Sequence, residues 1–94
     1  MEANQNSLRK EFVINNKLGL HARPAAMFVK LANRFDAEIW VGHDDDEVNG
    51  KSIMGLMMLA AASGMKISIS AEGEDATAAV SALGDLVEGG FEEN

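Results

Sequence analysis

Residues 19–35 read GLHARPAAMFVKLANRF and place a helical pattern directly after a histidine. The apolar residues of this stretch repeat at i, i+3, i+4 and i+7, the spacing of one helix face: Phe28, Leu31, Ala32 and Phe35. Pro24 falls in the first turn of the predicted helix, where a missing N–H costs no intrahelical hydrogen bond. The helix is therefore expected to begin close to His21 and to pack its apolar face against a core.

Strand-like and helix-like segments alternate on both sides of this helix. Strands are expected at residues 9–14, 37–41, 47–49 and 65–71, where β-branched or apolar residues alternate with polar ones. Two further helices are expected at residues 53–62 and 75–87. The order β-α-β-β-α-β-α predicts an α+β open-faced β-sandwich, in which a four-stranded antiparallel sheet carries three helices on one face.

The size and composition of the chain favour one domain over residues 1–94. The chain has 94 residues, of which 47% are hydrophobic, and no cysteine. This composition suffices for a core and excludes a disulfide framework or a thiolate metal cluster. Residues 1–7 are polar and are expected to form a disordered extension. The longest apolar run, residues 53–62, is too short to span a bilayer, so we expect a cytoplasmic protein without membrane insertion.

Charge is distributed unevenly along the chain, whose net charge is -7. All 8 basic residues lie in residues 1–66, together with 8 of the 15 acidic residues, and the remaining 7 acidic residues follow. An acidic chain is repelled by phosphate backbones, which argues against nucleic acid as a partner. Several cations nevertheless share one face of the first helix with a methionine: Arg23, Met27, Lys30 and Arg34.

His21 lies where a helix N-terminus would favour an anion. The N–H groups of Ala22 and Arg23 have no intrahelical acceptor, and the helix dipole favours negative charge there. The guanidinium of Arg23 can hold two phosphoryl oxygens. The small residues Gly19, Ala22 and Ala25 are expected to leave room for the active site of a partner. The pattern predicts a phosphoryl acceptor, and the alternative is an ordinary N-cap or turn histidine.

Two stretches of the chain resemble motifs of a known family, the HPr phosphocarriers of the bacterial phosphoenolpyruvate-dependent phosphotransferase system. They are GLHARPA at residues 19–25 and NGKSIMGL at residues 49–56, and the resemblance extends over residues 9–91. It implies that His21 accepts a phosphoryl group on Nδ1 from enzyme I and passes it to the histidine of an enzyme IIA-type domain. Arg23 would steady the group in both complexes. The protein would then be a carrier in sugar transport, without a cofactor and without catalysis of its own.

Ser52 suits the N-cap of the second helix. In many members of the family, the matching serine is phosphorylated by a kinase/phosphorylase that serves carbon catabolite regulation, and the resemblance implies the same regulatory role for Ser52. Gly50-Lys51-Ser52 also matches the end of a nucleotide-binding P-loop. Asp45 stands where that motif needs its first glycine, so we reject the P-loop reading.

The second predicted helix is apolar on nearly every side, although a helix in a small domain can bury only one side. By analogy with the family, Leu56 and Leu59 are expected in the core. Methionine-rich surfaces can repack against several partners, so the remaining apolar residues of this helix predict a docking surface. The alternative is that these remaining residues also fill the core. The predicted partner-binding residues are Ala26, Met27, Lys30, Lys51, Ile53, Met54 and Met57.

Three other interpretations of the sequence were weighed. His43 with the acidic residues 44–47 could form a metal loop, but the spacing does not fit an EF-hand, and we predict no metal site. The acidic ending at residues 89–94 resembles the nitrogen-related branch of the phosphotransferase system. A regulatory interaction domain is the third, since the family includes members that lack the histidine. We expect a monomer in each case.

Overall fold

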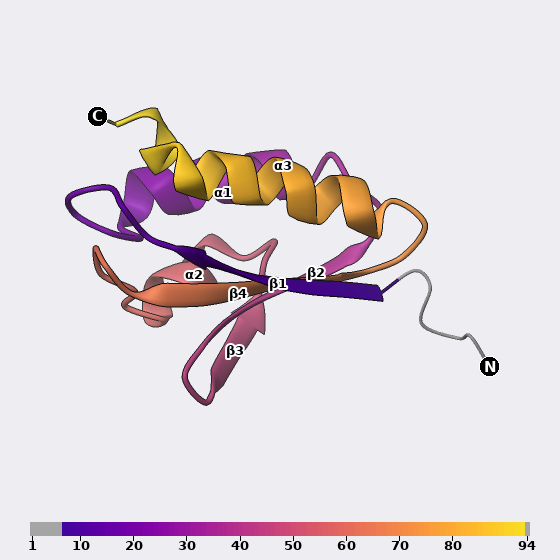
Figure 1. The fold of residues 1–94 in the computed structure, drawn as a ribbon, viewed down its shortest axis with the longest axis horizontal. Coiled ribbons are helices and arrows are strands. Elements are labelled where there is room, and N and C mark those ends of the chain that lie inside the picture. Colours follow the sequence, from indigo (N-terminus) through magenta and orange to yellow (C-terminus); the bar gives the residue numbers. More distant parts are fainter. Residues whose placement is uncertain (1–6, 94) are drawn as a thin grey trace.

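The computed structural model describes residues 7–93 and builds them into the predicted order of strands and helices (Figure 1). The elements are β1 (Ser7–Val13), α1 (Ala22–Ala32), β2 (Glu38–His43), β3 (Asp46–Asn49), α2 (Ile53–Met58), β4 (Lys66–Glu72) and α3 (Ala76–Glu88), followed by a 3-10 turn, η1 (Gly90–Glu92). The predicted extension at residues 1–7 lies outside the described residues except for Ser7. That residue pairs with Glu72 as the first residue of β1, so the prediction of disorder is wrong for Ser7.

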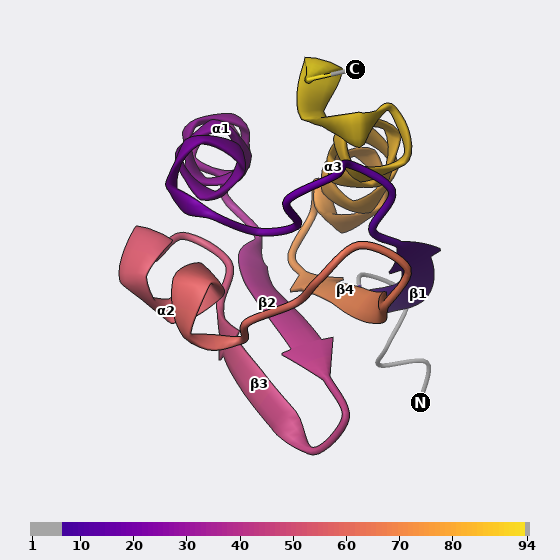
Figure 2. The same ribbon diagram turned by 90° about the vertical axis from the view of Figure 1, so that its left-hand side faces the viewer.

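The four strands form one antiparallel sheet in the order β1-β4-β2-β3. β4 pairs with β1 on one side and with β2 on the other, which makes it a central strand. α1 and α3 lie side by side over one face of the sheet, and α2 packs against α1 and β3 (Figures 1 and 2). The predicted four-stranded antiparallel sheet with three helices is confirmed.

The core lies between the sheet and the helices. The predicted apolar face of α1 is present, with Phe28 and Ala32 fully buried and Leu31 and Phe35 packed against the core from its margin. Leu56 is the buried residue of α2, and Leu59, directly after the helix, is buried as well, so both lie in the core as expected. Burial of this apolar area is the main contribution that stabilises so small a fold.

The burial pattern of β4 differs from the prediction at two positions. Ser68 is one of the polar residues that alternate along the strand predicted at residues 65–71, and such residues are expected to face solvent. It is only 6% exposed, because Glu11 of β1 and Gly42 of β2 flank it in the sheet. Met65 is one of the apolar residues of the same pattern, which are expected in the core, but it precedes the strand and is 38% exposed. The alternation Ile67, Ile69, Ala71 is buried as predicted.

α2 ends at Met58 and not near Ala62, so the predicted helix was too long. Ala60 adopts a left-handed backbone with φ of 53°, which an α-helix does not allow. Beyond it, Ala61 is buried, and its carbonyl accepts the N–H of Leu20 at 2.9 Å. The chain therefore leaves the helix early in order to pair with the loop that precedes His21.

The chain folds back after α3. Phe91 in η1 is 1% exposed, and its left-handed φ of 56° turns the residues that follow it. We refer to residues 89–93 as the 89–93 segment. Viewed from the end in Figure 2, this segment lies beyond the end of α3, on the same side of the molecule as the start of α1. Residues from the two ends of the sequence thus come together at one place.

Candidate functional site

The loop before His21 is fixed by hydrogen bonds and by one glycine. The fully buried Asn16 donates from Nδ2 to the Gly19 carbonyl at 2.8 Å. Gly19 has a φ of +71°, and a Cβ at this position would overlap the backbone of Ala61 and Ala62. Glycine is required here because both the backbone conformation and the close approach exclude a side chain. The room that we expected Gly19 to leave for a partner is filled by the protein itself.

His21 is the N-cap residue of α1. Its backbone is extended (φ -86°, ψ -169°), and its carbonyl accepts the first intrahelical hydrogen bond from Ala25 at 3.0 Å. The N–H groups of Ala22 and Arg23 precede that bond and have no intrahelical acceptor, and their role as an anion site stays a prediction. The His21 side chain is 36% exposed. A partner can therefore reach the ring.

Arg23 and Ala22 are exposed on the first turn of α1, whereas Ala25 is fully buried. Ala25 therefore belongs to the core, and the expectation that it leaves room for a partner was wrong. Within residues 7–93 the Arg23 guanidinium takes part in no ion pair. A surface pocket beside His21 is lined by Lys17, Leu18, Arg23, Glu92 and Glu93. It brings a second cation, Lys17, to the same place, together with two carboxylates.

Glu93 is a site residue that sequence reasoning missed. Its Oε2 lies 3.1 Å from Nε2 of His21, and its Oε1 accepts Nδ2 of Asn16 at 2.9 Å. The contact joins residues 72 positions apart in the chain. Only the backward turn at Phe91 makes it possible, and no local spacing signals it.

Ser52 caps α2 as predicted, because its Oγ accepts the N–H of Gly55 at 3.0 Å. Lys51 lies beside it, and its Nζ donates to the Phe35 carbonyl at 2.7 Å. That bond ties α2 to the end of α1. The role of Lys51 in partner binding stays a prediction, since its ammonium already has an acceptor.

The predicted docking residues lie on α1 and α2, which contact each other. Ala26 and Lys30 are exposed on α1, Met27 is half-buried, and Met27 and Lys30 line a groove that continues to Leu86 of α3. α2 exposes four large apolar side chains, of which Met58 was not predicted: Ile53, Met54, Met57 and Met58. We call these four residues the α2 patch. The alternative in which they fill the core was wrong.

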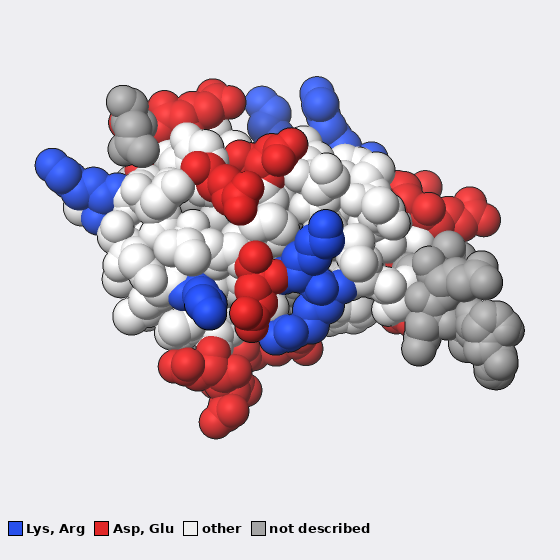
Figure 3. Space-filling model, in the orientation of Figure 1, with Lys and Arg blue, Asp and Glu red and all other residues white. Residues whose placement is uncertain are grey.

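Charges on the face seen in Figure 3 are mixed, and acidic side chains gather at the bottom, over the hairpin of β2 and β3. In that hairpin His43 contacts Asp44 at 3.4 Å, and its Nδ1 lies 3.0 Å from the Lys66 carbonyl. Within residues 7–93 no three histidine or acidic side chains group as metal ligands would.

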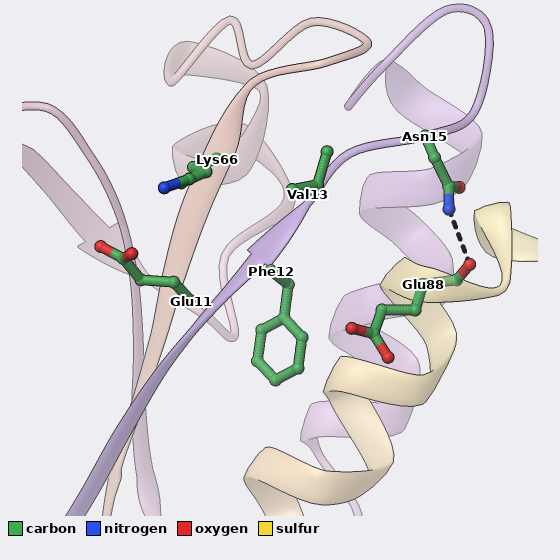
Figure 4. A pocket seen from close by; sticks show the side chains of 6 residues that line it. All are labelled: Glu11, Phe12, Val13, Asn15, Lys66 and Glu88. Atoms are coloured by element: carbon green, nitrogen blue, oxygen red, sulfur yellow. Dashed lines mark hydrogen bonds between the residues drawn. The ribbon is translucent and has the colours of Figure 1, made fainter.

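A second pocket lies between β1 and α3, where Asn15 donates to the Glu88 carbonyl at 2.8 Å (Figure 4). Glu11 and Glu88 line it, with Lys66 as its single basic residue. This charge suits a phosphoryl group poorly, so we assign no function to the pocket.

A small open-faced sandwich that presents an accessible imidazole at a helix N-terminus, beside an exposed guanidinium, belongs to the class of phosphoryl carriers. A family model described as "PTS HPr component phosphorylation site" matches residues 8–89. The chain belongs to the HPr family, the phosphocarriers of the phosphotransferase system, and as such it is a carrier and not an enzyme.

Individual relatives agree with this membership. The chain is 51% identical to the phosphocarrier protein HPr of Neisseria meningitidis serogroup A over 92% of its own length and 97% of that protein. It is 48% identical to HPr-like protein Crh of Halalkalibacterium halodurans, over 86% of its own length and 96% of that protein. The crystal structure of HPr-C-His from Thermoanaerobacter tengcongensis matches with a TM-score of 0.89 at 48% identity, covering 93% of this chain and 98% of that one.

None of the helices within residues 7–93 is both long and apolar enough to cross a membrane.

Proposed function

We propose that His21 accepts a phosphoryl group on Nδ1 from phosphorylated enzyme I and delivers it to enzyme IIA-type domains. The observation that carries the proposal is the position of the His21 ring, half-exposed at the start of α1 beside the N–H groups of Ala22 and Arg23. Membership of the HPr family implies both partners and a cytoplasmic location for the exchange.

The transfer requires a nucleophile and a place for the oxygens of the phosphoryl group. The Nδ1 lone pair attacks phosphorus while the bond between phosphorus and the donor breaks, and the donor keeps that electron pair. The guanidinium of Arg23 and the positive end of the α1 dipole stabilise the charge on the transferred oxygens. A phosphorylated ring nitrogen is a good leaving group. In the second transfer, the acceptor histidine attacks phosphorus, the bond between phosphorus and Nδ1 breaks, and His21 keeps that electron pair.

The proposal is tested by incubating the protein with enzyme I and phosphoenolpyruvate and mapping the product. We expect an acid-labile phosphoryl adduct on His21 that is absent from His21→Ala. Recovery of unmodified His21 after exposure to a donor that phosphorylates the Neisseria relative would contradict the proposal. The same assay with a donor of the nitrogen-related branch separates the two branches by rate. It also tests a regulatory role without phosphoryl transfer, the third alternative that the sequence leaves open.

We further propose that phosphorylation of Ser52 by a kinase/phosphorylase slows the carrier. Ser52 caps α2 next to the α2 patch, so a phosphate here would place a dianion on the docking surface. The charge would repel an acidic partner surface, while the helix N-terminus would tolerate it.

Ser52→Asp is expected to slow phosphorylation by enzyme I and to leave the fold intact, because aspartate is also a good N-cap. Ser52→Asn is the matched control, since asparagine caps as well without adding charge. Rates are measured as a function of carrier concentration. Equal rates for the two variants would contradict the electrostatic account.

We also infer that the carrier acts as a monomer. His21, Arg23 and Glu93 all come from one chain, so the site needs no second copy. Sedimentation should give a mass near 10.0 kDa, and twice that mass would contradict the inference.

A further inference from the structure

The side chain of Glu93 contacts the nitrogen of His21 opposite to the one that the proposed function uses. Oε2 of Glu93 lies 3.1 Å from Nε2 of the ring. An ionised carboxylate can only accept hydrogen bonds, so the ring nitrogen that faces it must carry the proton. A neutral ring with its proton on Nε2 leaves the lone pair on Nδ1. The contact therefore selects one tautomer of the neutral imidazole.

The Glu93 carboxylate is itself held in place. Its second oxygen, Oε1, accepts Nδ2 of Asn16 at 2.9 Å, and the Asn16 side chain is fully buried. The Glu93 side chain is only 20% exposed. A carboxylate with an ordered partner on each oxygen keeps a fixed orientation, and the ring that donates to it is fixed as well.

The backbone of the 89–93 segment is also anchored. Phe91 is 1% exposed and packs into the core, and the N–H of Glu93 donates to the Gly90 carbonyl at 3.0 Å. Asn15, next to Asn16, donates to the Glu88 carbonyl just before the segment. The Asn15 bond, together with the Asn16–Glu93 bond, ties this end of the chain to the loop before His21, while Phe91 anchors the segment in the core.

We propose that Glu93 is a positioning residue for phosphoryl transfer: it holds the His21 ring in the Nε2–H tautomer, so that Nδ1 faces the incoming phosphoryl group as a lone pair. Nδ1 has no hydrogen-bond partner within residues 7–93, in keeping with this role. The negative charge beside Nε2 also stabilises positive charge that develops on the ring when Nδ1 attacks phosphorus. The inference rests on the proposed function for its effect on rate, but the choice of tautomer does not depend on it.

The experiment uses the full chain and two measurements. Nitrogen-15 NMR of the His21 ring, at a pH where the ring is neutral, reports which nitrogen carries the proton. The rate of phosphorylation by enzyme I is measured on the same samples, with kcat and KM separated. Three variants are compared with the wild type: Glu93→Ala, Glu93→Gln and the control Glu88→Gln. The control removes a carboxylate at the end of α3 whose side chain lies at the pocket of Figure 4.

In the wild type we expect the proton on Nε2. Glu93→Ala should give a mixture of tautomers and lower kcat about tenfold, the lower end of the range for removal of a carboxylate that orients a metal-bound histidine. Glu93→Gln has one acceptor oxygen where the carboxylate has two, and Asn16 Nδ2 and His21 Nε2 both need an acceptor. It should therefore restore the Nε2–H tautomer and the rate only in part. Glu88→Gln should match the wild type in both measurements. An amide-proton spectrum of each variant verifies the fold.

Two results would overturn the inference. One is a Glu93→Ala variant whose His21 tautomer and whose kcat both equal those of the wild type. The other is a reduced rate with an unchanged tautomer, because Glu93 would then act through its charge or through the fold alone. If neither the wild type nor any variant is phosphorylated, the proposed function fails. The NMR measurement still decides whether Glu93 selects the tautomer.

Discussion

Arg23 lies two residues after His21, on the exposed first turn of α1. A guanidinium offers two parallel N–H donors to a phosphoryl group, whereas a lysine offers a point charge. Arg23→Lys should therefore lower the rate of phosphorylation by enzyme I about tenfold, the effect of losing roughly one charge-assisted hydrogen bond. Arg9→Lys, the same exchange on β1, is the control. Equal rates for Arg23→Lys and the wild type would show that charge alone suffices.

The residues of the site differ in how far the sequence could predict them. His21, Arg23 and Ser52 follow from local signals, namely a helix start, a neighbouring cation and an N-cap residue. Asn16 and Glu93 could not be predicted, because their contacts cross the whole chain and depend on the turn at Phe91. A phenylalanine with positive φ is uncommon, and the burial of its side chain helps to stabilise that turn.

At the scale of the elements, the loop between β1 and α1 is held against the segment that follows α2. Gly19→Ala would place a methyl group against the backbone of Ala61 in a left-handed conformation. We expect the free energy of unfolding to fall by about 1–3 kcal/mol, as for other overpacked sites. Gly64→Ala is the matched control, since Gly64 also has a positive φ (+91°) but open space around it.

Urea unfolding of both variants separates the two contributions. The control reports the cost of the left-handed backbone, and the excess for Gly19→Ala reports the clash. Equal losses of stability would mean that the contact with Ala61 does not matter. A selective loss for Gly19→Ala should also reduce phosphorylation, because the loop sets the position of His21.

The types and order of the strands and helices were predictable, because the hydrophobic periodicity of each segment agrees with the glycine and proline residues that mark the ends of the segments. The errors lie where tertiary contacts decide. α2 stops at Met58 because Ala61 pairs with Leu20. Ser68 is buried because β4 is central, and strand order was not predicted from the sequence. The end of α2 and the burial of Ser68 both depend on contacts with residues that are distant in the sequence.

At the scale of the whole molecule, the α2 patch and the cations of α1 lie on neighbouring helices, as expected for one docking surface with an apolar centre and a charged rim. Met54 is 73% exposed, so Met54→Glu should leave the free energy of unfolding nearly unchanged. It should raise KM for enzyme I severalfold, because a charge is buried when the partner docks.

Thr77→Glu is the control for this surface, since it adds the same charge at the exposed start of α3, at the opposite end of the molecule from α2 (Figure 1). Steady-state phosphorylation by enzyme I gives KM for both variants. The docking surface would have to lie elsewhere if Met54→Glu and Thr77→Glu gave the same KM as the wild type.

The position of the phosphoryl group on the His21 ring tests the central claim most directly. The ring is labelled with nitrogen-15, the protein is phosphorylated by enzyme I and phosphoenolpyruvate, and coupling to phosphorus identifies the bonded nitrogen. We predict coupling at Nδ1, with the proton still on Nε2 beside Glu93. Coupling at Nε2, or a ring that carries no phosphorus, would contradict the account.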